Sequence, residues 1–320
     1  MKHFLSFHTI FVLDENIKWL EEFIKYYIHI GFDHFYLYDN EGTTGGDGTS
    51  KKNKYGFPIE VNNTQENNMM FQNILAKYQD KITYLKWQPR SKEGNVIYGQ
   101  DEGVKHFMQN YGAQTEWVAL MDFDEFLFSP KNINIPDYLY NLQSNISCVK
   151  IVQKKFEDRF LTDNNDFSIT RNFKCINKEI GVEWSPKNIV RCNDFLGIDS
   201  IHNIAVKNEV FIEDSSVLRF NHYNVNDKLL DWMTNLYSSP TKFQLDGIDD
   251  GMKRYSLLFD SNIEPFSSYT FNLNDNFYWR YLIIAFLFIF LILLQFYNSK
   301  PNISMTQIYY KPLSMFFKPK

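Results

Sequence analysis

The sequence predicts an α/β protein in which helices flank a mostly parallel sheet. Short apolar, β-branched stretches alternate with amphipathic stretches from the N-terminus onward, and the amphipathic stretches are long enough to cross between parallel strands. Hydrophobic residues make up 44% of the 320 residues and aromatic residues 18%, which is enough apolar surface for a large core. The net charge of -5 excludes a protein whose main partner is nucleic acid, because a phosphate backbone demands a basic surface.

The first elements form a β-α-β unit. Residues 7–13 are apolar and β-branched and predict a strand, with Asp14 as the cap of the helix that follows. Apolar residues then recur at intervals of three and four up to Gly31, which predicts a helix over this stretch. Residues 34–38 predict a second strand, parallel to the first because the connection is a helix.

A glycine-rich stretch, residues 42–51, follows the second predicted strand. A phosphate-binding loop would end in Gly-Lys-Ser/Thr and open a helix, and because this stretch does neither, it favours a flexible turn. Residues 82–87 predict a third strand, and residues 98–111 predict a helix with one apolar face. Residues 117–120 predict a buried strand that runs directly into a group of acidic residues.

That acidic group consists of Asp122, Asp124 and Glu125. Alternation along a strand puts Asp122 and Asp124 on one side, at the carboxyl end of a parallel strand, where open α/β sheets bind ligands. Carboxylates are costly to bury unless a cation or water compensates them, and hard oxygen ligands suit Mg²⁺ or Mn²⁺ shared with a diphosphate. A solvated acidic turn is the alternative interpretation.

An Asp-x-Asp pattern at a strand end also opens the active site of the haloacid-dehalogenase phosphatases. In those enzymes the first Asp attacks phosphorus, the second handles the proton, and Thr or Val lies two residues beyond the second Asp. Phe126 occupies that position here. A phosphatase is therefore a disfavoured alternative.

Three further motifs accompany the acidic group. Residues 31–40 read Gly-Phe-Asp-His-Phe-Tyr-Leu-Tyr-Asp-Asn, residues 187–191 read Lys-Asn-Ile-Val-Arg, and His222 is followed by Tyr223. Together with residues 122–127 they resemble glycosyltransferase family 92, the DUF23 group, among the nucleotide-sugar glycosyltransferases of the GT-A fold. The resemblance covers residues 5–225, and it implies a Rossmann-like fold with a mostly parallel sheet flanked by helices.

The resemblance implies a metal-dependent transfer of a sugar from a UDP-sugar, UDP-galactose among them, to a glycan or glycoconjugate acceptor. The metal, Mn²⁺ or Mg²⁺, neutralises the leaving diphosphate as a Lewis acid. It implies metal ligation by Asp122 and Asp124, with His222 as a further ligand or a structural histidine. The residues implied on the nucleotide-sugar side are Glu15, Asp39, Asn40, Gln100 and Lys187. Lys187 and Arg191 would offset diphosphate charge, or they are solvated surface cations.

We expect an inverting transfer, which needs a general base near the acceptor hydroxyl. Glu157 and Asp158 are the candidates, since residues 154–160, Lys-Lys-Phe-Glu-Asp-Arg-Phe, stand where the family often has Phe-Gly-Ser. A catalytically silent membrane protein that binds glycans or nucleotides on the same scaffold is the alternative from another functional class.

The C-terminal part predicts a membrane anchor. Residues 282–294 are uniformly apolar, and flanking aromatic residues extend the segment to 277–297, about 31 Å of helix, close to the hydrocarbon thickness of a bilayer. A buried helix of a soluble core is the alternative. The predicted organisation is a catalytic domain over 1–255, a connector over 256–276, a single-pass transmembrane helix over 277–297 and a basic tail over 298–320. Because residues 1–20 lack the apolar run of a signal peptide, we expect the catalytic domain to face the cytoplasm.

Overall fold

The computed structural model of the chain describes residues 1–43, 64–156, 168, 175–177, 185–223 and 245–259. These residues belong to one compact unit, Met1–Glu264. Most of the predicted connector, the whole predicted transmembrane segment and the tail lie outside the described residues. Within the described part, no helix is both long and apolar enough to cross a membrane.

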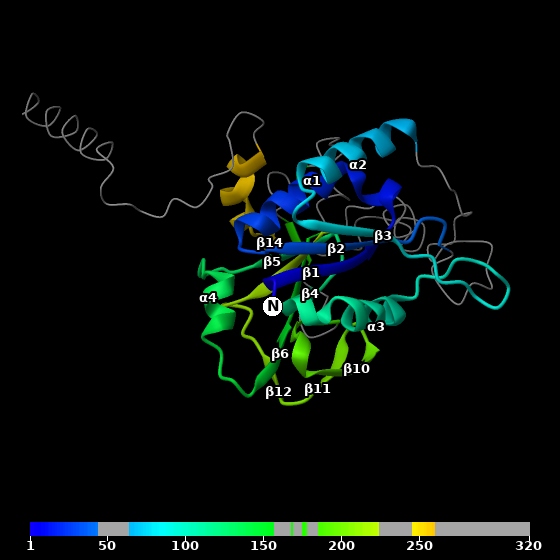
Figure 1. The fold of residues 1–320 in the computed structure, drawn as a ribbon. Helices are drawn as coiled ribbons and strands as arrows, with labels where there is room; N and C mark the ends of the chain where they lie inside the picture. Colours follow the sequence, from blue (N-terminus) through cyan, green and yellow to red (C-terminus); the bar gives the residue numbers. More distant parts are fainter. Residues whose placement is uncertain (44–63, 157–167, 169–174, 178–184, 224–244, 260–320) are drawn as a thin grey trace, which may run out of the picture. The chain divides into compact units, whose positions relative to one another are not determined.

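A seven-stranded sheet forms the centre of this unit, in the strand order β12-β6-β9-β4-β1-β2-β3 (Figure 1). Its strands are β1 (His3–Phe11), β2 (His34–Asp39), β3 (Ile82–Lys86), β4 (Thr115–Leu120), β6 (Ile146–Ile151), β9 (Lys187–Arg191) and β12 (Glu209–Ile212). All neighbouring strands are parallel except β9, which runs antiparallel to both β4 and β6. The prediction of an α/β fold with a mostly parallel sheet is confirmed.

The first elements follow the predicted order with shifted boundaries. β1 begins at His3, four residues before the predicted start, and α1 spans Leu13–His29. Asp14 is not the helix cap: Val12 holds that position without a side-chain hydrogen bond, and Asp14 lies in the first turn. An acidic residue in the first turn also interacts favourably with the helix dipole. Asp14 therefore indicates where the helix starts only to within one or two residues.

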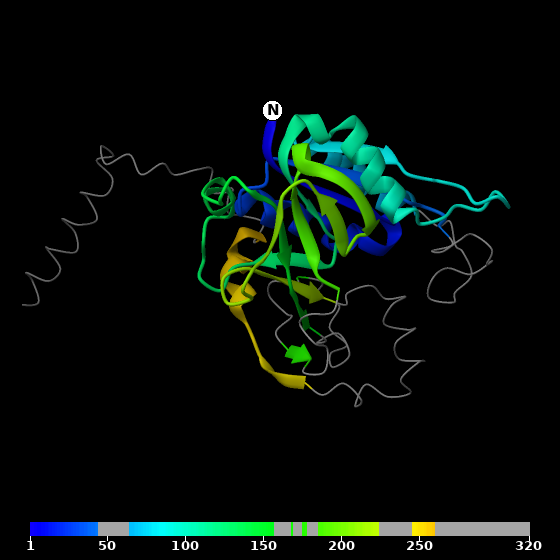
Figure 2. The ribbon, with the colours of Figure 1, turned by 90° about the horizontal axis from the view of Figure 1, so that it is seen from below.

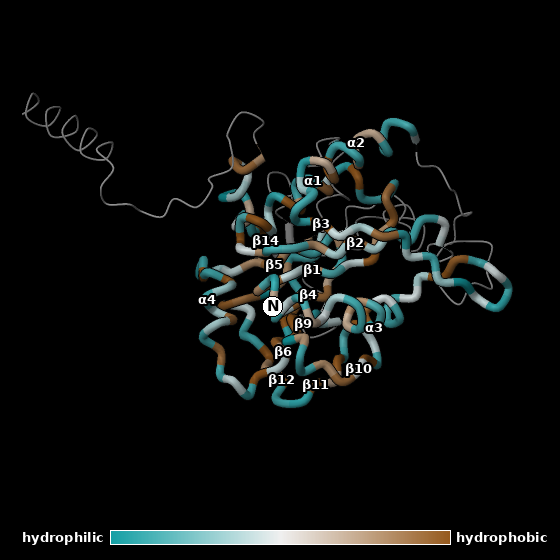
Figure 3. The backbone as a smooth tube through the Cα atoms, viewed as in Figure 1, coloured by the Kyte–Doolittle hydropathy of each residue, from teal (hydrophilic) through white to brown (hydrophobic). Residues whose placement is uncertain are grey.

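The two faces of the sheet carry separate hydrophobic cores because side chains alternate along each strand. On one face, Phe7 and Phe11 of β1 pack with α1 and with α2 (Gln65–Lys77). On the other face, Ile10 and Tyr38 pack with α3 (Gln100–Asn110) and with a hairpin of β10 (Phe195–Ser200) and β11 (Asn203–Val206). Figure 2 shows α3 and this hairpin in front of the sheet, and Figure 3 shows hydrophilic and hydrophobic residues alternating along α1 and α2.

A second sheet of five strands, in the order β14-β8-β7-β13-β5, was not predicted from the sequence. Its strands are β5 (Glu125–Phe128), β7 (Gln153–Phe156), β8 (Cys175–Asn177), β13 (Arg219–Tyr223) and β14 (Leu245–Ile248). The Tyr26 and Tyr27 hydroxyls of α1 donate hydrogen bonds to the carbonyl oxygens of Leu127 and Glu125, at 2.5 and 2.7 Å. These bonds fix β5, and with it the acidic group, to the first helix.

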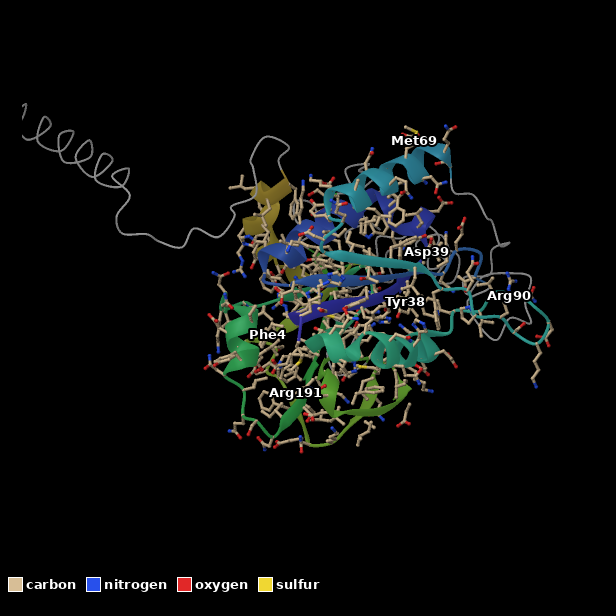
Figure 4. All side chains as sticks on the ribbon, viewed as in Figure 1. Phe4, Tyr38, Asp39, Met69, Arg90 and Arg191 are labelled. Atoms are coloured by element: carbon tan, nitrogen blue, oxygen red, sulfur yellow. The ribbon has the colours of Figure 1, made fainter. Side chains whose placement is uncertain are left out.

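The remaining elements are short. They are α4 (Ile135–Tyr140) and 3₁₀ helices at Gly112–Gln114, Cys192–Asp194 and Gly251–Phe259. The last of these runs across the predicted domain boundary at residue 255. Figure 4 shows Phe4, near the start of β1, at the opposite end of the sheet from Tyr38 and Asp39, where β2 ends. The parallel strands β1, β2, β3 and β4 therefore share a carboxyl edge, and the acidic group follows β4 at that edge.

Candidate active site

The acidic group forms a turn between the two sheets. β4 ends at Leu120 and β5 begins at Glu125, and the N–H of Glu125 donates to the carbonyl oxygen of Asp122 at 3.2 Å. Residues 121–124 are not part of a strand, so the alternation argument does not determine where their carboxylates point. Their orientation is instead described by their contacts: Asp122 faces Lys187 and Gln100, and Asp124 faces His222.

Asp122 is held by Lys187. The Lys187 Nζ lies 2.6 Å from Asp122 Oδ2 and 3.0 Å from Glu125 Oε2. Lys187 begins β9, which pairs with β4 so that Asn188 lies opposite Leu120. The side chain of Lys187 is 3% exposed, which excludes the solvated-cation alternative. Burial disfavours the ammonium, but Asp122 and Glu125 outweigh that effect and raise the pKa of Lys187, so it stays charged.

Gln100, the first residue of α3, also reaches Asp122. Its Nε2 donates to Asp122 Oδ1 at 3.3 Å, while Oδ2 of the same carboxylate faces Lys187. The structure thus brings together three of the predicted site residues. Arg191, at the other end of β9, stacks on Trp117 and pairs with Glu116 at 3.0 Å, so it lies at the end of β4 opposite the acidic turn (Figure 4).

Asp124 faces His222 instead. The Asp124 Oδ2 and the His222 Nε2 lie 3.4 Å apart, with 18% and 21% of the side chains exposed. His222 is placed there by β13, where it pairs with Glu125 of β5, and the Tyr223 N–H donates to the Asp124 carbonyl at 2.8 Å. Two predicted metal ligands therefore converge from different elements.

Gln153 contacts the other ring nitrogen of His222. Its Oε1 lies 3.1 Å from His222 Nδ1, an arrangement in which Nδ1–H donates and Nε2 keeps its lone pair. In the neutral ring this lone pair points at the Asp124 carboxylate, which is repulsive, whereas a proton or a metal cation between the two atoms makes the contact favourable. Burial lowers and Asp124 raises the pKa of His222, and the net shift is upward, so the pair favours positive charge at this position.

The Asp124–His222 pair fits a divalent cation that shares its ligands with a phosphate. Adjacent donors at such a cation lie about 3 Å apart, close to the observed separation. No group of three or more His, Cys, Asp or Glu side chains among the described residues is arranged to hold a metal by itself. Mg²⁺ commonly takes one or two protein ligands and fills its other positions with phosphate oxygens and water. Asp124 and His222 would be two such protein ligands.

Asp39 and Asn40 lie at the end of β2, and both side chains are buried. Asp39 Oδ2 accepts from Tyr84 Oη at 2.8 Å and from Lys86 Nζ at 2.6 Å. Asn40 donates to the carbonyl oxygens of Trp87 and Ile97 at 2.7 and 3.0 Å. Asp39 thus contacts β3 itself, and Asn40 fastens the segment after β3 to the carboxyl edge. That either residue contacts a nucleoside stays a prediction.

The other predicted site residues are placed in part. Glu15 lies in the first turn of α1, directly after β1. Glu157 and Asp158, the candidates for the general base, lie outside the described residues. The sequence reasoning missed Gln153 and the partner role of Glu125. No local pattern identifies Gln153, because its contact with His222 is made across two strands that were not predicted.

No protein-family model matches the chain. A rice (Oryza sativa subsp. japonica) protein named as a glycosyltransferase family 92 protein is 25% identical over 182 residues, 56% of this chain. The match covers 26% of the rice protein, so the chain spans about a quarter of that relative's length. This distant relative supports the general class of glycosyltransferase, and it is of the same family that the sequence motifs resemble.

Proposed function

We propose that this chain is a metal-dependent glycosyltransferase of the GT-A fold that transfers a sugar from a UDP-sugar to a glycan or glycoconjugate. The observation that carries the proposal is the convergence of Asp124 Oδ2 and His222 Nε2, 3.4 Å apart, at the carboxyl end of β4. Ligands bind at this edge in open α/β sheets. The distant family 92 relative supports the same class of reaction.

The proposed site uses the chain's own residues to hold a diphosphate and its cation. A divalent cation, Mn²⁺ or Mg²⁺, would neutralise the leaving diphosphate as a Lewis acid. Asp124 and His222 would hold this cation, with Gln153 fixing the imidazole by accepting from Nδ1–H. Asp122, already engaged by Lys187 and Gln100, would face the donor from the other end of the same turn.

The donor side of the site would be completed at the ends of β1 and β2. Glu15, Asp39, Asn40, Gln100 and Lys187 are the proposed residues there. Asp39 and Glu41 both bind Lys86, at 2.6 and 2.5 Å, so this lysine is held at the carboxyl edge with 46% of its side chain exposed. With two carboxylates against one ammonium, this cluster is net negative, so it would not attract the diphosphate itself.

We further propose that Glu157 or Asp158 is the general base of an inverting transfer and that residues 277–297 anchor the protein to a membrane. UDP-galactose is the first donor to test. These proposals rest on the family resemblance and on sequence composition.

The direct test is hydrolysis of a panel of UDP-sugars with and without Mn²⁺. We expect Mn²⁺-dependent turnover that Asp124→Asn and His222→Ala each reduce by at least about 100-fold. Asp80→Asn, which removes an exposed carboxylate before β3, is the matched control and should leave turnover unchanged. Saturable UDP binding without turnover in the unaltered protein would instead support the silent binding protein, and phosphate release from an aryl phosphate would support a phosphatase.

A further inference from the structure

A buried ion pair lies beneath the acidic turn. Lys187 Nζ is 3.0 Å from Glu125 Oε2, and the two side chains are 3% and 2% exposed. The same ammonium lies 2.6 Å from Asp122 Oδ2, and the Asp122 side chain is 35% exposed. The buried Lys187 ammonium therefore pairs with two carboxylates, the buried Glu125 and the partly exposed Asp122.

Glu125 also fixes the backbone of the turn. Its Oε2 accepts the N–H of Asp122 at 2.9 Å, and its own N–H donates to the Asp122 carbonyl oxygen at 3.2 Å. The Glu125 carbonyl oxygen in turn accepts from Tyr27 Oη at 2.7 Å. Glu125 thus uses Oε2, its N–H and its carbonyl oxygen to set the position of Asp122 relative to α1 and the two sheets.

The three carboxylates of the turn have different charged partners. Asp122 and Glu125 share the Lys187 ammonium, whereas Asp124 faces His222. Buried ion pairs add little stability compared with apolar packing, so stability alone does not account for a charged pair at this position. An effect of the ion pair on the neighbouring cation site would account for it. The Lys187 ammonium repels a divalent cation, and it occupies the Asp122 carboxylate, which could otherwise bind that cation.

We propose that Lys187 and Glu125 are positioning residues that keep Asp122 out of the coordination of the metal, so that the acidic turn and β13 offer a cation Asp124 and His222 but not Asp122. The inference rests on the proposed function. Two protein donors leave the remaining coordination positions to diphosphate oxygens and water. The cation then binds tightly only together with the nucleotide, and it can leave with the product diphosphate.

Loss of the Lys187 ammonium should raise the affinity of the site for Mn²⁺. Removing the ammonium frees Asp122 Oδ2 as a third donor, so Mn²⁺ should bind more tightly without nucleotide. Because Lys187→Met alone leaves Glu125 buried and unpaired, the test uses the double variant Glu125→Gln/Lys187→Met, in which Gln still accepts the Asp122 N–H. A third substitution, Asp122→Asn, should reverse the gain.

The experiment is a titration of Mn²⁺ followed by electron paramagnetic resonance, in the absence of nucleotide. We expect the dissociation constant to fall about tenfold in the double variant and to return toward the original value in the triple variant. A residue with a merely structural role would leave the affinity unchanged or weaken it. An unchanged or weaker Mn²⁺ affinity in a folded double variant would overturn the proposal.

A second measurement, amide hydrogen exchange at Asp122, tests the structure of the turn in the absence of metal. The Asp122 amide should be protected from hydrogen exchange in the unaltered protein and in Glu125→Gln, and should exchange about tenfold faster or more in Glu125→Ala, which removes the acceptor. An unprotected Asp122 amide in the unaltered protein would also overturn the proposal. Failure of the unaltered protein to bind UDP with Mn²⁺ would overturn the proposed function instead, whatever the variants do.

Discussion

The three carboxylates of the acidic turn differ in environment although they lie within four residues. Asp122 is 35% exposed and paired with Lys187, Asp124 is 18% exposed and faces His222, and Glu125 is 2% exposed and bonds to the turn itself. A side chain's partners therefore decide its role more than its place in an Asp-x-Asp pattern does. In the proposed function Asp124 is the carboxylate that binds the cation, whereas Asp122 is held by Lys187 and Gln100.

At the same scale, Gln153 should control the affinity of the site for metal. Gln153→Leu removes the acceptor for His222 Nδ1–H, so the imidazole loses its fixed orientation and tautomer. Loss of such a partner typically weakens metal binding by about 10- to 100-fold. We expect this loss in a titration of Mn²⁺ in the presence of UDP.

Gln153→Glu is the matched control, since a carboxylate still accepts from Nδ1–H. Its Mn²⁺ affinity should equal or exceed that of the unaltered protein. Equal affinities in the Leu and Glu variants would show that Gln153 does not orient His222.

At the scale of elements, the end of α1 depends on Gly31. Its φ is +99°, and a Cβ at this position would lie 2.5 Å from Pro136 Cγ of α4. Gly31→Ala should therefore lower the free energy of unfolding by about 2 to 4 kcal/mol, from backbone strain and overpacking together. Urea denaturation measures this loss.

Gly94 separates the two causes. Its φ is +83°, and a Cβ there would meet no heavy atom within 4 Å. Gly94→Ala should cost only about 1 kcal/mol, from the backbone alone. If both substitutions lower the free energy of unfolding equally, the close approach of Gly31 to Pro136 does not contribute.

The packing of β1 against α3 should make the protein sensitive to acid. Burial lowers the pKa of His8 to about 3, and its ring lies against Tyr38 and Phe107. Because His8 takes up a proton near pH 6.5 only when the chain is unfolded, its contribution is complete above that pH and is lost as pH falls toward 3. Stability should fall by about 2 kcal/mol between pH 7.5 and pH 5 through this residue.

His8→Phe keeps an aromatic ring in the same place and removes the titrating group. Urea denaturation at both pH values should show a smaller loss in this variant by about that amount. An equal loss of stability in both proteins would mean that the pKa of His8 is the same in the folded and the unfolded chain.

At the scale of the whole molecule, the sequence predicts the first half well and the second half poorly. The unit of β1, α1 and β2 is predictable because apolar residues repeat at strand and helix periods over long stretches. The second sheet is not, because β5 and β7 are four residues long and β7 carries two lysines. The antiparallel insertion of β9 between β4 and β6 brings Lys187 to Asp122, and no local pattern encodes that long-range pairing.

The site shows the same division. The acidic turn was recognisable from Asp122 and Asp124 after an apolar run, and the family resemblance added His222. That His222 meets Asp124 rather than Asp122 follows from the register of β13 on β5. Strand register across a sheet depends on packing between distant segments, which a single sequence does not reveal.

The proposed membrane anchor is also a property of the whole chain. The full chain should sediment with membranes, and a chain ending at residue 274 should stay in the soluble fraction, because residues 277–297 provide the apolar length of a span. A full chain that stays in the soluble fraction would contradict the anchor and support a core helix over residues 282–294.

The central claim is that Asp124 and His222 together bind the cation of a nucleotide-sugar. Electron spin echo envelope modulation of Mn²⁺ bound with UDP tests it most directly, because this measurement detects a nitrogen atom coordinated to the metal. We predict nitrogen modulation in the unaltered protein that is absent in His222→Ala. Mn²⁺ bound with UDP but without nitrogen modulation, or with modulation that survives His222→Ala, would contradict the claim.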